Sequence, residues 1–75
     1  MKKKENDPLL YKVGKLIKQH REEQNLTQTQ LSEISGVEQS YISKLELGKK
    51  PGYTFGIAAK LFTALKIKFS EIDDL

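Results

Sequence analysis

The segment from Gln39 to Leu47 carries an amide, an ammonium and two hydroxyl groups at spacings that place them along one edge of a helix. Gln39 can donate and accept hydrogen bonds side by side, as the edge of an adenine requires. The Lys44 ammonium can reach O6 and N7 of a guanine, and Ser40 and Ser43 can bond several base edges. These residue types indicate hydrogen bonding to the edges of bases, and the alternative is a polar helix face with no target.

The opposite edge of this segment is apolar, with Ile42 and Leu45 facing inward so that the helix is held at a fixed angle. A shorter helix is predicted just before it. The run from Thr27 to Gln30 is typical of a capping box, in which the two side chains satisfy each other's free backbone amides. Gly36 then favours a sharp turn with a positive φ.

Helical periodicity extends over the rest of the chain, and no stretch alternates as a strand does. Asp7 and Pro8 predict the start of a first helix, and Gly14 inside it is tolerable where another backbone passes close. Thr54 is expected to cap a fourth helix and Ser70 a last short turn. The predicted fold is therefore all-α, a bundle of five short helices. Its remaining expected core residues are Leu9, Leu10, Val13, Leu16, Ile17, Leu31, Ile34, Phe55, Ala58, Leu61, Phe62 and Leu65.

Composition excludes several classes of protein. The 75 residues include no cysteine and a single histidine, so neither a disulfide framework nor a structural zinc site is expected. No apolar run approaches the roughly 20 residues of a membrane span, and we expect a cytoplasmic protein without a cofactor. No carboxylate pair or nucleophile–base set indicates an enzyme. The net charge of +3 suits an anionic partner such as nucleic acid.

Two short helices joined by a glycine turn have the plan of a helix-turn-helix, in which the second helix enters the major groove of DNA. The stretches IKQHREEQN and LTQTQLSEISGVEQSYISKLELGKKP resemble the phage-repressor-like (XRE) family, which includes the lambda repressor and Cro. The resemblance covers about residues 9–75. It implies a lambda-repressor-like five-helix domain that binds double-stranded DNA. Two positions depart from the family pattern, with Ser32 in place of an alanine and Glu38 in place of a serine or threonine cap.

Contacts to the phosphate backbone are expected as well, and the resemblance implies one at Gln28, the position that the family uses for this. The expected residues are Thr27, Gln28, Tyr41, Lys49 and Lys50. For Gln28 the alternative is a solvated surface side chain, and for Tyr41 it is an aromatic ring that only packs on the bundle. Glu38 is expected to point aside or to accept from a cytosine amino group, because a carboxylate near phosphates weakens binding.

In several relatives the positions of Arg21 and Glu46 form an ion pair that ties the first helix to the recognition helix. We expect the same structural pair here, and two independent surface charges are the alternative. Loss of one partner of a partly buried pair would leave the other charge stranded.

The two ends of the chain have separate expectations. Residues 1–7 are predicted to be a flexible basic arm, which either reaches DNA through Lys2–Lys4 or stays a solvated tail, and residues 8–75 form the domain. The apolar residues at the other end indicate a homodimer seam or an incidental patch on a closed core. They are Ile67, Phe69, Ile72 and Leu75. A two-fold dimer would place its recognition helices about 34 Å apart on a palindrome.

These features predict a sequence-specific transcriptional regulator, in the first instance a repressor, that binds its operator as a homodimer. An antitoxin or a restriction-modification controller protein, either with a protein partner, is a second interpretation. A helix-turn-helix used only for protein interaction is the third, and absence of salt-dependent DNA binding would favour it.

Overall fold

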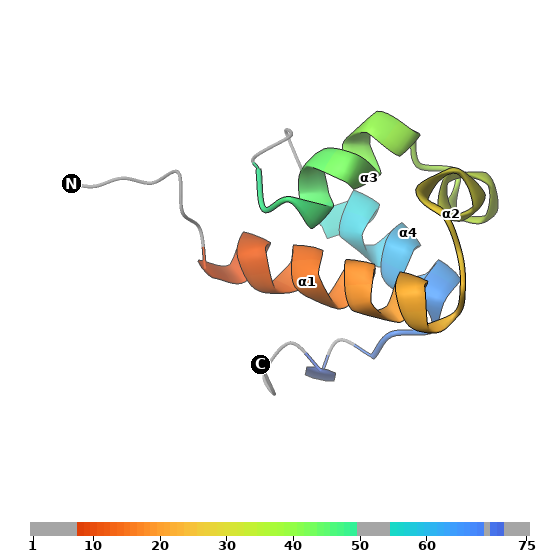
Figure 1. Cartoon of the computed structure of the whole chain (residues 1–75). Coiled ribbons are helices and arrows are strands. Elements are labelled where there is room, and N and C mark those ends of the chain that lie inside the picture. The colour runs from red at the N-terminus through yellow and green to blue at the C-terminus, as the bar shows by residue number, and fades with distance from the viewer. Residues whose placement is uncertain (1–7, 50–54, 69, 72–75) are drawn as a thin grey trace.

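The structure is a computed structural model, and it describes residues 8–49, 55–68 and 70–71. These residues contain four α-helices. They are α1 (Pro8–Glu23), α2 (Gln28–Ser35), α3 (Gln39–Glu46) and α4 (Phe55–Leu65). Figure 1 shows α1 running beneath α3, with α2 at one end and α4 behind. The described residues contain no strand, so the all-α class is confirmed. None of the described helices is both long and apolar enough to cross a membrane.

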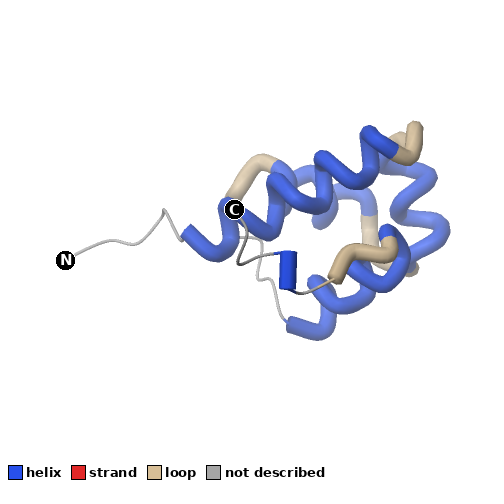
Figure 2. Tube along the Cα trace, turned by 90° about the horizontal axis from the view of Figure 1, so that it is seen from below, coloured by secondary structure: helices blue, strands red, loops and turns tan. Residues whose placement is uncertain are grey.

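The helices form because apolar residues recur at helical spacing and meet in a single core. Both α1 and α2 contact α3 and α4, so every helix contributes to one interior. Viewed from below, the four helices surround that interior (Figure 2). The core consists of Leu10, Val13, Leu16, Ile17, Leu31, Val37, Ile42, Leu45, Leu61, Phe62, Leu65 and Ile67.

The first helix passes α3 at Gly14, the position where the sequence permitted a close approach of another backbone. A Cβ atom at Gly14 would collide with the backbone carbonyl oxygen of Leu45. The absence of a side chain is therefore what allows α1 and α3 to cross at this separation, and it sets the depth at which α3 lies on the bundle.

Both ends of α2 have the predicted chemistry. The Thr27 hydroxyl accepts from the Gln30 backbone N–H at 3.0 Å, and the Gln30 side chain accepts from the Thr27 N–H at 2.8 Å, so the capping box is confirmed. Gly36 ends α2 with a φ of 78°, a left-handed conformation in which a Cβ is strained. The capping box and this glycine together fix α2 to eight residues and redirect the chain into α3.

Two expectations for the fold need correction, and others lie beyond the described residues. The fifth helix is represented among the described residues by a single 3₁₀ turn at Ser70–Glu71. Ile34 is 57% exposed, because it lies on the outer side of α2 rather than in the core. The arm at residues 1–7, the cap at Thr54 and the side chains of Leu9 and Phe55 lie outside what is described.

Candidate nucleic-acid interface

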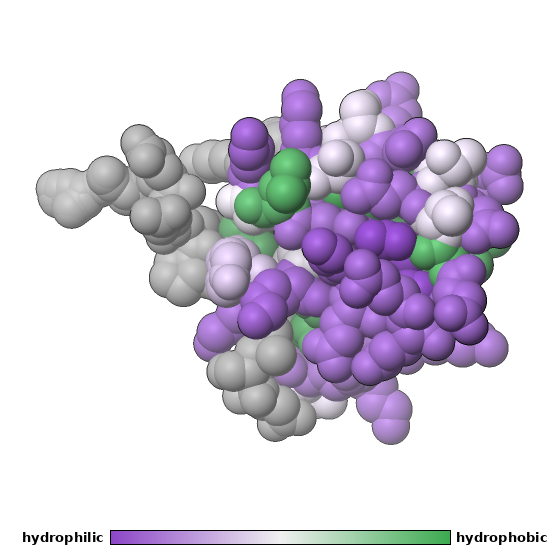
Figure 3. Space-filling view, viewed as in Figure 1, coloured by the Kyte–Doolittle hydropathy of each residue, from purple (hydrophilic) through white to green (hydrophobic). Residues whose placement is uncertain are grey.

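The outer edge of α3 is polar and open to solvent. Gln39, Ser40 and Lys44 are exposed and Ser43 is half-buried, while Ile42 and Leu45 on the inner edge are completely buried. The helix is thus anchored on one side and free on the other. Figure 3 shows a mainly hydrophilic surface around this region, with only small separated hydrophobic areas. Such a surface suits hydrogen bonding to a polar ligand rather than burial against an apolar partner.

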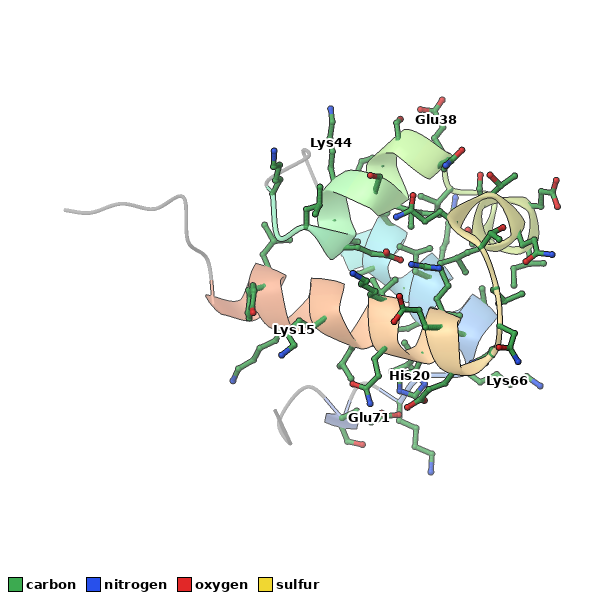
Figure 4. All side chains as sticks on the ribbon, in the orientation of Figure 1. Lys15, His20, Glu38, Lys44, Lys66 and Glu71 are labelled. Atoms are coloured by element: carbon green, nitrogen blue, oxygen red, sulfur yellow. The ribbon has the colours of Figure 1, made fainter. Side chains whose placement is uncertain are left out.

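The start of α3 holds the one acidic group on this edge. Glu38 is the N-cap residue and makes no side-chain capping hydrogen bond, so its carboxylate does not satisfy the free amides of the helix. Figure 4 shows Glu38 and Lys44 projecting from the same outer side of α3. Glu38 therefore shares the surface with the candidate base-reading residues and does not point aside.

The start of α2 offers less free hydrogen-bonding capacity than the sequence implied. The Thr27 hydroxyl is occupied by the capping box. The Gln28 side chain is half-buried, and its Nε2 donates to Glu46 Oε1 at 3.1 Å. A phosphate group at the start of α2 would therefore meet the free backbone N–H groups first, because the Gln28 side chain is already hydrogen-bonded to Glu46.

Arg21 and Glu46 form the centre of the hydrogen-bond network that includes Gln28. Arg21 Nε donates to Glu46 Oε2 at 2.7 Å and its Nη2 donates to Oε1 at 3.0 Å, while Nη1 donates to the Leu26 carbonyl oxygen at 2.8 Å. The two side chains are 12% and 3% exposed. The hydrogen bond to Glu46 is the main cause that raises the pKa of Arg21, so the guanidinium stays charged. The pair ties the end of α1 to the end of α3.

The three remaining phosphate candidates differ in position. The Tyr41 hydroxyl is buried without a hydrogen-bond partner among the described residues, and the half-buried ring packs against the core. This position favours the alternative of an aromatic ring that packs on the bundle, and the phosphate contact of Tyr41 stays a prediction. Lys49 is exposed just past α3, and Lys50 lies outside the described residues.

One residue of the expected dimer seam lies in the core. Ile67 is 6% exposed and packs with the other core residues, so it has little surface to offer a second chain, and the seam stays a prediction. Phe69, Ile72 and Leu75 lie outside the described residues.

A contact that the sequence did not indicate holds the 3₁₀ turn at Ser70–Glu71 to α1. His20 Nε2 lies 2.9 Å from Glu71 Oε1, and Figure 4 shows the two side chains pointing toward one another. The backbone N–H of Lys68 donates to Glu71 Oε2 at 3.2 Å. His20 therefore does more than lie on the surface of α1. Two residues 51 positions apart leave no periodic signal from which their pairing could be predicted.

This contact predicts a loss of stability in acid. The hydrogen bond from His20, and then that from the Lys68 amide, lower the pKa of Glu71 from its usual value of 4.5. A carboxylate whose pKa is lower in the folded state than in the unfolded state stabilises the fold at any pH above the unfolded-state pKa. This contribution is lost as the pH falls through the folded-state pKa. The free energies of unfolding of the wild type and of Glu71→Gln in urea should therefore differ at about pH 6. The difference should shrink below the usual carboxyl pKa and vanish below the lowered pKa of the folded state. A difference that grows in acid would contradict this assignment.

The α3 helix is buried on one edge through Ile42 and Leu45, is polar on the other edge, and follows a turn at Gly36. This arrangement defines a helix-turn-helix DNA-binding domain. A comparison with family models matches residues 17–72 to the helix-turn-helix family. The match covers most of the chain, and the chain belongs to this family as an XRE-like DNA-binding protein of the transcription-regulator type. Comparison with curated proteins and with solved structures finds no match.

Proposed function

We propose that this protein is a sequence-specific transcriptional repressor that binds a palindromic operator as a homodimer. The observation that carries the proposal is the contrast between the two edges of α3, with Ile42 and Leu45 fully buried and Gln39 and Lys44 exposed. Such a helix is held rigidly enough to lie in the major groove at a fixed depth. Bound over a promoter, the domain would exclude the polymerase.

Within this proposal the exposed residues divide by role. Gln39 and Lys44 read base edges, and Ser40 and Ser43 add adaptable hydrogen bonds. Lys49, together with the backbone amides at the start of α2, holds phosphates and sets the register of the protein on the duplex. Arg21 and Glu46 keep α3 at its angle and do not contact DNA.

The palindrome and the dimer follow from the size of the recognition surface. A helix of eight residues reaches only a few base pairs, and two copies related by a two-fold axis double the sequence that is read. The C-terminal residues Phe69, Ile72 and Leu75 remain the proposed seam, without the buried Ile67. Size measurement by ultracentrifugation, with and without an operator duplex, tests this part of the proposal.

The proposed reading face predicts two different kinds of mutational effect. An operator is first identified by selecting bound duplexes from a random pool. Gln39→Ala or Lys44→Ala should then reduce the preference for the operator over a scrambled duplex, by about 1–3 kcal/mol per lost base contact. Titration of both duplexes at several salt concentrations measures the affinity and the preference together.

The matched control is Lys49→Ala, which removes one exposed positive charge next to the same helix. It should weaken binding to both duplexes alike and reduce the salt slope by about one. Operator preference that survives both Gln39→Ala and Lys44→Ala would show that the reading face is assigned wrongly. No binding to any duplex at about 50 mM salt would instead favour a role in protein interaction.

A further inference from the structure

Thr29 and Gln39 meet across the turn that joins α2 to α3. The Thr29 hydroxyl donates to Gln39 Oε1 at 3.3 Å. Thr29 is the second residue of α2 and Gln39 is the first residue of α3, and both are exposed. This hydrogen bond therefore joins the two helices at the surface, beside the edge of α3 that the proposed function assigns to DNA.

The two partners differ in mobility. A β-branched threonine on a helix has few rotamers, and Thr29 lies in the first turn of α2, which the capping box fixes in place. A free glutamine has many rotamers, and binding to one of them costs conformational entropy. The Thr29 hydroxyl thus acts as a rigid donor that holds the mobile side chain of Gln39 before any ligand arrives.

The direction of the hydrogen bond determines what Gln39 presents. Its Oε1 accepts from Thr29, whereas the two N–H donors on Nε2 have no partner within the described part of the chain. The Gln28 amide, which precedes Thr29, donates to Glu46 and does not serve Gln39. In the major groove, N7 is an acceptor that both purines present and that neither pyrimidine has.

We propose that Thr29 is a positioning residue that holds Gln39 so that Nε2 donates to N7 of a purine in the major groove. The inference rests on the proposed function of α3, and it adds a residue on α2 that sets specificity without reading a base itself. In the structure Thr29 holds the amide through Oε1, and Nε2, which Thr29 leaves unoccupied, then donates to the purine.

The experiment compares Thr29→Val, which keeps the shape and removes the hydroxyl, with Thr29→Ser, which keeps the hydroxyl. Each variant, Gln39→Ala and the Thr29→Val/Gln39→Ala double variant are used to select duplexes from a random pool. The wild type should select a purine at one position of each half-site, and Gln39→Ala should lose that preference. Thr29→Val should lower it about threefold to tenfold at this position alone, whereas Thr29→Ser should retain it.

The double variant separates positioning from direct contact. If Thr29 acts through Gln39, Thr29→Val has no further effect once Gln39 is alanine. A uniform loss of affinity that persists in the Gln39→Ala background would mean that Thr29 touches the DNA backbone, and it would overturn the inference. A Gln39-dependent position at which purines and pyrimidines are selected equally on each strand would overturn it as well. An unchanged profile for Thr29→Val would have the same consequence.

A measurement on the free protein does not depend on DNA. The side-chain amide of Gln39 should have a higher NMR order parameter in the wild type and in Thr29→Ser than in Thr29→Val. Equal order parameters in all three proteins would overturn the inference while leaving the proposed function intact. If the wild type selects no sequence at all, the proposed function fails and the purine assignment fails with it.

Discussion

Gly14→Ala is expected to destabilise the domain strongly, although alanine is the better helix former. The new Cβ would collide with the carbonyl oxygen of Leu45 and lie 3.1 Å from its carbonyl carbon. Both partners are backbone, so no rotamer change relieves the contact and the two helices must separate. Overpacking of this kind costs about 1–3 kcal/mol or more, which exceeds the roughly 1 kcal/mol that alanine gains over glycine inside a helix.

Urea denaturation of the two proteins measures the difference in the free energy of unfolding. The matched control is the pair Lys15→Gly and Lys15→Ala, at an exposed position of the same helix. There the alanine variant should be more stable than the glycine variant by about 1 kcal/mol, because only helix propensity differs. If Gly14→Ala also stabilises the protein, the close crossing of α1 and α3 is not as the structure has it.

Local chemistry explains which parts of the fold could be predicted from the sequence. The bounds of α2 follow from Thr27, Gln30 and Gly36, because a capping box and a left-handed glycine act within a few residues of each other. The contents of the core follow in the same way from helical periodicity, and Gly14 pointed to a close approach without naming Leu45. Ile34 is one exception, since periodicity alone does not say which apolar residue of a short helix faces outward. Val37 and Ile67 are others, because they belong to the core but lie outside the helices from which the periodicity is read.

The candidate site could be predicted only as a set of residue types. Exposure of Gln39 and Lys44 follows from their place opposite Ile42 and Leu45. The partners of individual side chains do not follow, because hydrogen bonds between helices depend on how the helices are oriented in space. The hydrogen bond from Gln28 to Glu46 is an example, because neither the types of these two residues nor their separation in the sequence indicates it.

The other large expected effect concerns the ion pair between α1 and α3. Arg21→Ala should lower the free energy of unfolding by about 3–5 kcal/mol, because it leaves the carboxylate of Glu46 buried with only the Gln28 amide as a partner. The Leu26 carbonyl oxygen would lose its donor as well. Arg21→Lys should cost less but should not restore the wild-type value, since a lysine cannot make the bidentate contact.

Glu22 supplies the control, because its Oε2 lies 3.9 Å from Nη2 of the same guanidinium but its side chain is 59% exposed. Glu22→Ala should change stability by about 1 kcal/mol at most, as exposed ion pairs do. Arg21→Met combined with Glu46→Leu should recover much of the loss, because it removes both charges and fills the space with apolar groups. If Arg21→Ala costs no more than Glu22→Ala in urea titrations, the pair contributes only as a surface ion pair. The angle of α3 must then depend on its apolar contacts alone.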